Sequence, residues 1–152
     1  MVVAMLSSVA LAAFAAVPAN AQAAMPPGGS ARNAATGFYL NDSSNPGHDD
    51  AYAMVGPNPV RWKPAPNTAG TLSANGAYAL DAKYGSRAPG TKIISWPAQG
   101  TRNQQWQFPG DGTIRIAALT AGQQPMCMSV ALADLTVELQ PCAPYDPRQQ
   151  WS

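Results

Sequence analysis

Three tryptophans recur at an almost constant interval along the chain. Trp62, Trp106 and Trp151 are 44 and 45 residues apart. The second and third each end a Gln-Gln-Trp tripeptide, in "NQQW" and "RQQW", and the first lies in "PVRW". A repeat of this length indicates a structural unit that is used three times. The predicted units cover about residues 36–64, 70–108 and 112–152.

The same order of short segments precedes each tryptophan. A short strand is followed by a turn, a second strand that ends in x-Pro, and a loop; the second unit has "YALDA" and "KIISWPA", and the third "CMSVA" and "TVELQPC". The first unit has "FYLND" and "AYAMVGP". Turn-forming Gly, Pro, Asn, Asp and Ser fill the connections, and helical periodicity is missing. This predicts an all-β, closed assembly of three units with about four strands each, which leaves few sheet edges.

The N-terminal segment predicts export. Residues 1–23 contain an apolar run followed by the small-x-small patterns Ala19-Asn20-Ala21 and Ala21-Gln22-Ala23, although no Lys or Arg precedes the run. The run is short for a membrane span. We therefore expect a secretory signal peptide at 1–23, a Pro/Gly-rich linker at 24–35, and a secreted protein, extracellular or periplasmic, with no membrane span. A buried N-terminal helix is the alternative, and the segment lacks the polar face that such a helix needs.

Charge and composition exclude several classes of function. Only 11% of the residues are charged and the formal net charge is +1, so a basic surface for nucleic acid is absent. His48 and Glu138 are the one His and the one Glu of the chain, a poor supply of groups for acid–base catalysis. The sequence also lacks a cluster of metal ligands. We expect no enzyme activity, no metal and no cofactor.

Two cysteines lie in the third unit. An even number of cysteines in an exported chain suggests a disulfide. In the alignment of the repeats, Cys127 matches Ala79 and Cys142 matches Ala98, so the second unit lacks both positions together. This is expected of one bond between neighbouring strands. The alternative is two free buried thiols; a catalytic thiol is disfavoured because His48 lies in a distant loop.

The ordered set of strand, x-Pro and Q-x-W resembles the ricin B-type lectin family, whose β-trefoil domain has three such repeats. The resemblance covers roughly residues 36–152 and is stronger in the second and third units than in the first. It implies a β-trefoil that reversibly binds a terminal, galactose-like sugar. A family sugar site takes an Asp, an aromatic residue before the Pro and an Asn before the motif Gln from one repeat. The chemistry fits, because a carboxylate binds sugar hydroxyls and a ring covers the C–H face.

The second unit alone carries the full set of residues. By this resemblance the predicted carbohydrate-binding residues are Asp81, Trp96, Asn103 and Gln104. The residues at the corresponding positions are Asn41, Gly56 and Pro59 in the first unit, and Ser129, Gln140 and Arg148 in the third. The Q-x-W residues are expected to be structural: Gln104, Trp106, Gln149, Trp151 and, in the first unit, Trp62.

Other roles for these residues and for one loop stay open at this point. Asp81 could cap a turn and Trp96 could be a core residue, while Lys83 or Tyr84 could line the same cleft as Asp81. The segment "NDSSNPGHDD" offers oxygen donors for Ca²⁺, but its spacing matches no EF-hand loop, so a solvated loop is favoured.

The sequence thus favours a secreted carbohydrate-binding lectin domain with one sugar site, in the second repeat. One shallow site gives an affinity of roughly the millimolar scale, so a partner subunit or self-association would supply avidity. The alternative is a β-trefoil protein-interaction, toxin-associated or inhibitor subunit that has lost sugar binding, which the degenerate first and third units favour.

Overall fold

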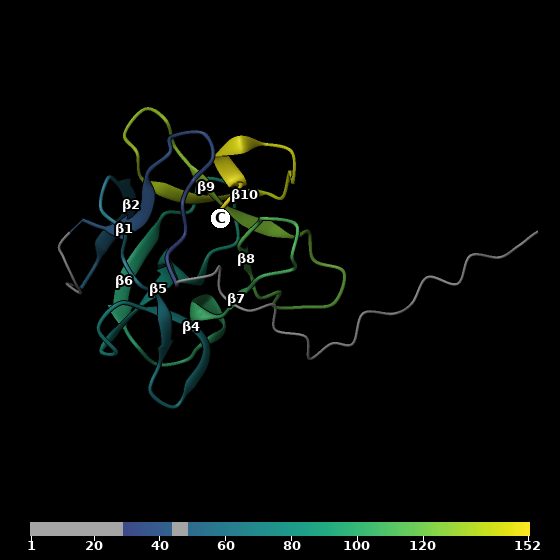
Figure 1. Ribbon diagram of the computed structural model, residues 1–152. Coiled ribbons are helices and arrows are strands. Elements are labelled where there is room, and N and C mark those ends of the chain that lie inside the picture. Colours follow the sequence, from purple (N-terminus) through teal and green to yellow (C-terminus); the bar gives the residue numbers. More distant parts are fainter. Residues whose placement is uncertain (1–28, 44–48) are drawn as a thin grey trace, which may run out of the picture.

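The computed structural model describes residues 29–43 and 49–152, and these residues form an all-β fold (Figure 1). The predicted signal peptide, residues 1–23, lies outside the described residues. The strands are β1 (Tyr39–Asp42), β2 (Ala51–Gly56), β3 (Lys63–Ala65), β4 (Thr68–Ser73), β5 (Tyr78–Ala82), β6 (Ile93–Pro97), β7 (Trp106–Gln107), β8 (Arg115–Ile116), β9 (Met126–Val130) and β10 (Val137–Pro141). Short 3-10 turns follow three of the strands: η1 (Lys83–Gly85), η2 (Arg102–Gln104) and η3 (Pro147–Gln149).

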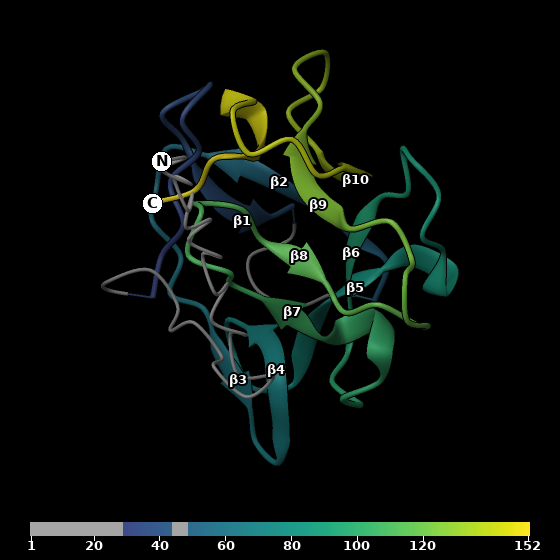
Figure 2. The ribbon, with the colours of Figure 1, turned by 90° about the vertical axis from the view of Figure 1, so that its right-hand side faces the viewer.

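The strands pair antiparallel and join neighbouring units. One sheet has the order β1-β2-β6-β5, a second β10-β9-β8-β7, and β3 pairs with β4. Figure 2 shows the β3–β4 hairpin at one end of the molecule and β7, β8 and β9 side by side. Because β2 belongs to the first unit and β6 to the second, hydrogen bonding between them fixes how these two units lie against each other.

Each repeated tryptophan is buried and anchored in the same way. Its indole N–H donates to a main-chain carbonyl in the first hairpin strand of its own unit. The bonds are Trp62 Nε1 to Leu40 O at 3.1 Å, Trp106 Nε1 to Leu80 O at 3.0 Å, and Trp151 Nε1 to Met128 O at 3.2 Å. This equivalence confirms the three units, and with the arrangement of strands it confirms the β-trefoil.

The strand register supports the alignment of the repeats. In each unit the residue expected at the sugar-stacking position faces the residue expected at the first cysteine position. These cross-strand pairs are Gly56 with Tyr39, Trp96 with Ala79, and Gln140 with Cys127. Positions predicted to correspond from sequence are therefore equivalent in space.

One shared core fills the centre of the assembly. The three tryptophans, Leu40, Leu80 and Met128 pack there with aliphatic side chains from all three units. Alternation along a strand decides which residues face this core. In β5, Leu80 and Ala82 point into it, so Asp81 between them lies on the opposite face of the sheet.

The N-terminal boundary differs from the predicted one. A linker was expected over residues 24–35, but Ala31 and Asn33 are buried, at 2% and 0% exposure. Asn33 forms a β-bridge with Trp151, and Arg32 exchanges two main-chain hydrogen bonds with Ser152. The prediction is wrong for residues 29–35. This segment is ordered by pairing with the adjacent strand β1 and with the distant C-terminal segment at Trp151.

Residues 31–33 form the first strand of the first unit, which the sequence did not predict. Leu40 N donates to Ala31 O at 2.8 Å, and at the equivalent place in the third unit Met128 N donates to Ile114 O at 2.9 Å. The first unit therefore begins before residue 36, and each unit has four strand positions. The first unit consists of residues 31–33, β1, β2 and β3, and the second of β4, β5, β6 and β7. The third consists of β8, β9, β10 and the segment at Trp151.

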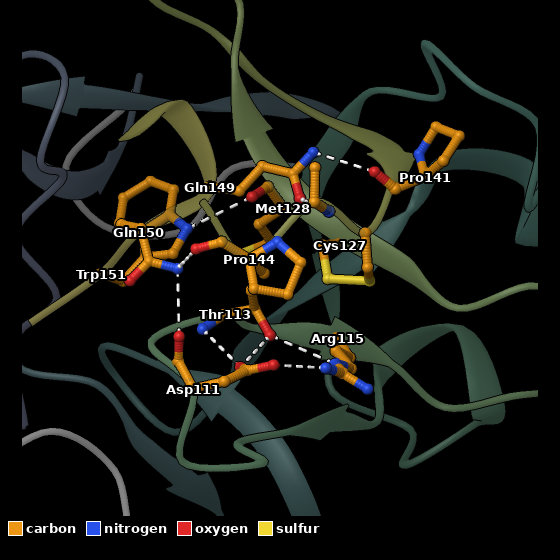
Figure 3. The surroundings of a disulfide bond; sticks show 12 residues. Asp111, Thr113, Arg115, Cys127, Met128, Pro141, Pro144, Gln149, Gln150 and Trp151 are labelled. Atoms are coloured by element: carbon orange, nitrogen blue, oxygen red, sulfur yellow. Dashed lines mark hydrogen bonds and ion pairs between the residues drawn. A yellow bond between two sulfur atoms is a disulfide. The ribbon is translucent and has the colours of Figure 1, made fainter. Parts of the chain in front are cut away.

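The predicted disulfide is confirmed. Cys127 in β9 is bonded to Cys142, which directly follows β10, across a sequence separation of 15. Figure 3 shows the bond next to the Q-x-W segment of the third unit, where Gln149 and Trp151 hydrogen bond to Pro141 and Met128. The disulfide thus closes the hairpin that carries these acceptors.

Removing this bond should destabilise the fold. Closing a loop of this length restricts the unfolded chain, so the Cys127→Ala/Cys142→Ala variant should lose about 3 kcal/mol of unfolding free energy. Urea titration followed by tryptophan fluorescence measures the loss, and the reduced wild-type protein should match the variant. A loss below about 1 kcal/mol would show that the bond does not stabilise the third unit.

Candidate functional site

The four predicted site residues come together beside β5, β6 and η2. Asp81 in β5 lies opposite Ile94 in β6, and Trp96 is two residues further along the same strand. Asp81 and Trp96 therefore share one face of the sheet. Asn103 Nδ2 in η2 lies 2.7 Å from both carboxylate oxygens of Asp81, and Gln104 Nε2 lies 3.0 Å from Asp81 Oδ2.

Gln104 also holds the loop that carries Asn103. Its Oε1 accepts from the main-chain N–H of Gln99 and Gly100 at 2.8 and 3.0 Å, and its Nε2 donates to Pro97 O at 3.0 Å. The side chain is fully buried, at 0% exposure. Its bonds are those of a structural residue, and the bond to Asp81 adds a positioning role.

The third unit repeats the structural part of this arrangement. Gln149 Oε1 accepts from Ala143 N at 2.8 Å, and Gln149 Nε2 donates to Pro141 O at 3.0 Å. The position that corresponds to Asp81 is Ser129, which is buried. Gln149 therefore holds the loop of the third unit as Gln104 does in the second, but Ser129 supplies no charged acceptor for a ligand.

The first and third units also differ at the other predicted positions. In the first unit Asn41 Nδ2 donates to Asn58 O at 2.8 Å, and Gly56 leaves no ring at the stacking position. In the third unit Gln140 Nε2 donates to Glu138 Oε1 at 2.8 Å, and Arg148 forms an ion pair with Asp146. The side chains of Asn41, Gln140 and Arg148 thus bind within their own unit.

Trp96 and Asp81 border a surface pocket of about 240 Å³. Trp96 is 38% exposed, so the alternative interpretation of a core residue is wrong. Asp81 accepts hydrogen bonds from the side-chain amides of Asn103 and Gln104, and so links β5 to η2. The residues around the pocket are Asp50, Asp81, Tyr84, Gly85, Ile94, Trp96 and Asn103.

The Asp81 carboxyl is largely shielded from water, at 3% exposure. Burial penalises the ionised form and raises the pKa of Asp81. The hydrogen bonds from Asn103 and Gln104 and the positive charge of Arg87 act on this pKa in the opposite direction. The site therefore holds a desolvated carboxylate whose bonding partners are already in place.

Arg87 ties together the two turns that flank the pocket. Its Nη1 donates to Gly85 O at 3.1 Å and Ser86 O at 3.4 Å, at the end of η1. Its Nη2 donates to Arg102 O at 3.1 Å, in η2, and to Ala117 O at 3.2 Å. Its Nε is buried and has no hydrogen-bond partner among the described residues. Carbonyl oxygens thus hold the guanidinium in place, and its positive charge acts on the Asp81 carboxylate.

Sequence reasoning missed Asp50, Gly85 and Ile94, and left Tyr84 open. Asp50 was assigned to a solvated loop, part of which, residues 44–48, lies outside the described residues. Asp50 N donates to Ser95 O at 2.9 Å, and its carboxylate pairs with Lys83 at 2.8 Å. A residue of the first unit therefore forms one wall of the pocket in the second. Only the pairing of β2 with β6 brings it there, and local sequence carries no signal for that pairing.

Over residues 29–43 and 49–152, the side chains of His, Cys, Asp and Glu gather nowhere in groups of three or more that could hold a metal ion. In the same part of the chain, no helix has the length and apolar character needed to cross a membrane.

The sequence and the fold together identify the family of this chain. The sequence pattern of the ricin-type β-trefoil lectin domain matches residues 62–152, more than half of the chain. The fold is that of a β-trefoil, with its site beside a Q-x-W motif. The chain belongs to the ricin-type β-trefoil lectin family. No curated protein sequence matches it closely enough to add a relative.

Solved structures share the fold. A designed threefold-symmetric protein, ThreeFoil, has a TM-score of 0.60 and 22% identity, over 80% of this chain and 94% of its own. The C-terminal half of an earthworm R-type lectin, in complex with GalNAc, has a TM-score of 0.57 and 14% identity, over 81% and 94%. A Polyporus squamosus lectin, bound to a human-type influenza-binding epitope, has a TM-score of 0.57 and 18% identity, over 81% and 46%. At these identities the likeness shows the fold alone.

The charge on Arg87 should be measurable at Asp81. NMR titration of the Asp81 carboxyl carbon should give a pKa above that of an ordinary aspartate, and Arg87→Met should raise this pKa further because a nearby positive charge is lost. Arg87→Lys keeps the charge and should leave the pKa close to that of the wild type.

Arg102→Met is the matched control, because that guanidinium binds Ala118 O and Leu119 O on the neighbouring loop. It should leave the pKa of Asp81 as in the wild type. An unchanged pKa in a folded Arg87→Met protein would refute the electrostatic role of Arg87.

Proposed function

We propose that this protein is a secreted lectin that binds one terminal sugar in the pocket of its second unit. The observation that carries the proposal is the convergence of Asp81, Asn103 and the exposed ring of Trp96 on one pocket. Membership of the lectin family supports a carbohydrate-binding domain. The residues at the equivalent places in the other units support a single site.

Each of the three side chains has a distinct role in this proposal. The Asp81 carboxylate accepts hydrogen bonds from neighbouring hydroxyls of the sugar, and charged acceptors make the stronger bonds of this kind. Asn103 Nδ2 already donates to Asp81, so Asn103 Oδ1 is the atom that accepts from the sugar. The Trp96 ring lies against the C–H face of the sugar. Gln104 acts indirectly, by holding Asp81 and the Asn103 loop.

The size of the pocket supports a small ligand. Its volume of about 240 Å³ is below the range of roughly 300–1,000 Å³ typical of drug-sized sites. A terminal, galactose-like sugar fits this description and the family resemblance. An affinity of roughly the millimolar scale follows for a single shallow site, so a partner subunit or self-association supplies avidity in this proposal.

We propose reversible binding without catalysis. Two carboxylates border the pocket, Asp50 and Asp81, and a pair of carboxylates is also what a glycosidase needs. Asp50 is ion-paired with Lys83, and Asp81 accepts from two amide side chains. Both carboxylates therefore already accept hydrogen bonds from side chains fixed by the fold, which suits a site that binds its ligand through hydrogen-bond acceptors.

Two features support secretion. The apolar N-terminal segment with its small-x-small patterns is typical of a secretory signal. The disulfide between Cys127 and Cys142 is of a kind that persists in oxidising compartments such as the extracellular space or the periplasm.

A second candidate function is protein interaction on a β-trefoil scaffold that no longer binds sugar. The degenerate positions of the first and third units favour it, since Gly56 and Gln140 stand where Trp96 stands in the second. The buried Asp81 with two amide donors argues against it, because folding alone gains little from a desolvated carboxylate.

A glycan array with the multivalently displayed protein tests the proposal. The wild type should bind glycans that share one terminal sugar. Asp81→Asn and Trp96→Ala should each lower the affinity by at least about tenfold, because the first removes a charged acceptor and the second removes the stacking surface. Gln140→Ala, at the equivalent of Trp96 in the third unit, is the matched control and should bind as the wild type does.

Circular dichroism and thermal unfolding establish that each variant is folded. Binding that survives both Asp81→Asn and Trp96→Ala would move the site to another unit. A folded wild type that binds no glycan would favour the protein-interaction function, which affinity capture of partners then tests.

A further inference from the structure

A row of side chains crosses the sheet outward from the pocket. Asp81 in β5 pairs with Ile94 in β6, and Ile94 pairs with Tyr52 in β2. Figure 1 shows these three strands in the sheet formed by the first and second units. Residues that are directly opposite one another project from the same face, so Tyr52 lies on the face that carries the pocket. Strand spacing places its Cα about 10 Å from that of Asp81.

Ile94 lies between Asp81 and Tyr52, the two ends of this row. It is buried, at 4% exposure, yet it lies outside the shared core and borders the pocket. Tyr52 is 43% exposed at the far end of the row. The row that begins at the pocket therefore ends in an exposed aromatic ring of the first unit.

A second exposed ring stands at the edge of the pocket. Tyr84 borders the pocket and is 92% exposed, although a tyrosine ring gains stability from burial. Its backbone has φ 60°, in the left-handed region that non-glycine residues seldom adopt. The fold thus holds this ring out to solvent at a conformational cost. Outliers of this kind concentrate at binding sites.

Lys83 links the two tyrosines. Its Nζ lies 5.3 Å from the ring centroid of Tyr52 and 5.3 Å from that of Tyr84, within the range of cation–π attraction. The same Nζ pairs with Asp50 on the pocket wall, 2.8 Å from Oδ1. The ammonium group therefore joins one ring from each unit to the wall of the pocket.

We propose that Tyr84 and Tyr52 form a second sugar-binding subsite beside the pocket, so that the ligand is an oligosaccharide of at least two sugars. This inference rests on the proposed lectin function. The terminal sugar occupies the pocket at Asp81 and Trp96, and the next sugar lies against the tyrosines. The pocket is too small for a longer glycan, and the exposed ring of Tyr84 at its edge gives the second sugar its place. Both units contribute to recognition, because Tyr52 and Asp50 come from the first.

The ratio of two affinities tests the subsite. Calorimetry with methyl β-galactoside and with lactose compares one terminal galactose alone and attached to a second sugar. The wild type should bind lactose about fivefold more tightly, the effect of one further aromatic contact. Tyr84→Asn and Tyr52→Thr should each lower this ratio, and the double variant should bring it to about one. Asparagine suits position 84 because it tolerates a left-handed backbone, and threonine suits a strand.

Two controls separate the subsite from the pocket. Trp96→Ala should weaken both ligands and keep the ratio. Tyr145 is 98% exposed and does not border the pocket, so Tyr145→Asn should bind both ligands as the wild type does.

The outcomes distinguish the inference from the proposed function. A wild-type ratio of about one, or a ratio that survives in the folded double variant, would overturn the subsite while leaving the terminal-sugar site intact. A folded wild type that binds neither ligand would overturn the galactose-like site, and the subsite with it.

Discussion

The bond between an indole N–H and a strand carbonyl organises every unit of this molecule. In each unit this bond joins the tryptophan segment at the end of the unit to the first strand of its hairpin, which is β1, β5 or β9. The tryptophans are Trp62, Trp106 and Trp151. Leaving such a buried carbonyl without a donor would cost about 1–3 kcal/mol. Once the tryptophan is fixed, the glutamine two residues before it is fixed too, and in the second and third units this glutamine closes the loop.

The proposed sugar site is a small addition to this structural motif. Leu80 supplies the carbonyl that binds Trp106, and Asp81 follows it directly, on the opposite face of β5. Gln104, held by the same motif, then donates to Asp81. One carboxylate, Asp81, and one exposed ring, Trp96, thus add a charged acceptor and an aromatic wall to a structural arrangement. The third unit keeps the motif but has Ser129 and Gln140 at these positions, and in our proposal it keeps only the structural role.

The sequence predicted features that recur, and it missed those that depend on a single contact between units. The period of the tryptophans predicted the three units, and the resemblance to a family brought Asp81 and Trp96 together. The first strand of the first unit escaped prediction because, besides pairing with β1, it depends on the pairing of Asn33 with Trp151 at the other end of the chain. Asp50 escaped because it reaches the pocket through the pairing of β2 with β6. No local pattern encodes either contact, since each joins segments far apart in the chain.

The indole N–H signals of the four tryptophans offer the most direct test of the central claim, that one unit alone binds sugar. A ¹⁵N-labelled sample is titrated with the sugar that the array selects, and Trp96→Phe assigns the Trp96 signal. The account predicts a large, saturable shift of the Trp96 signal, while those of the buried Trp62 and Trp151 stay in place. Saturable shifts at Trp62 or Trp151 with Trp96 unmoved would contradict it, because the sugar would then bind in the first or the third unit.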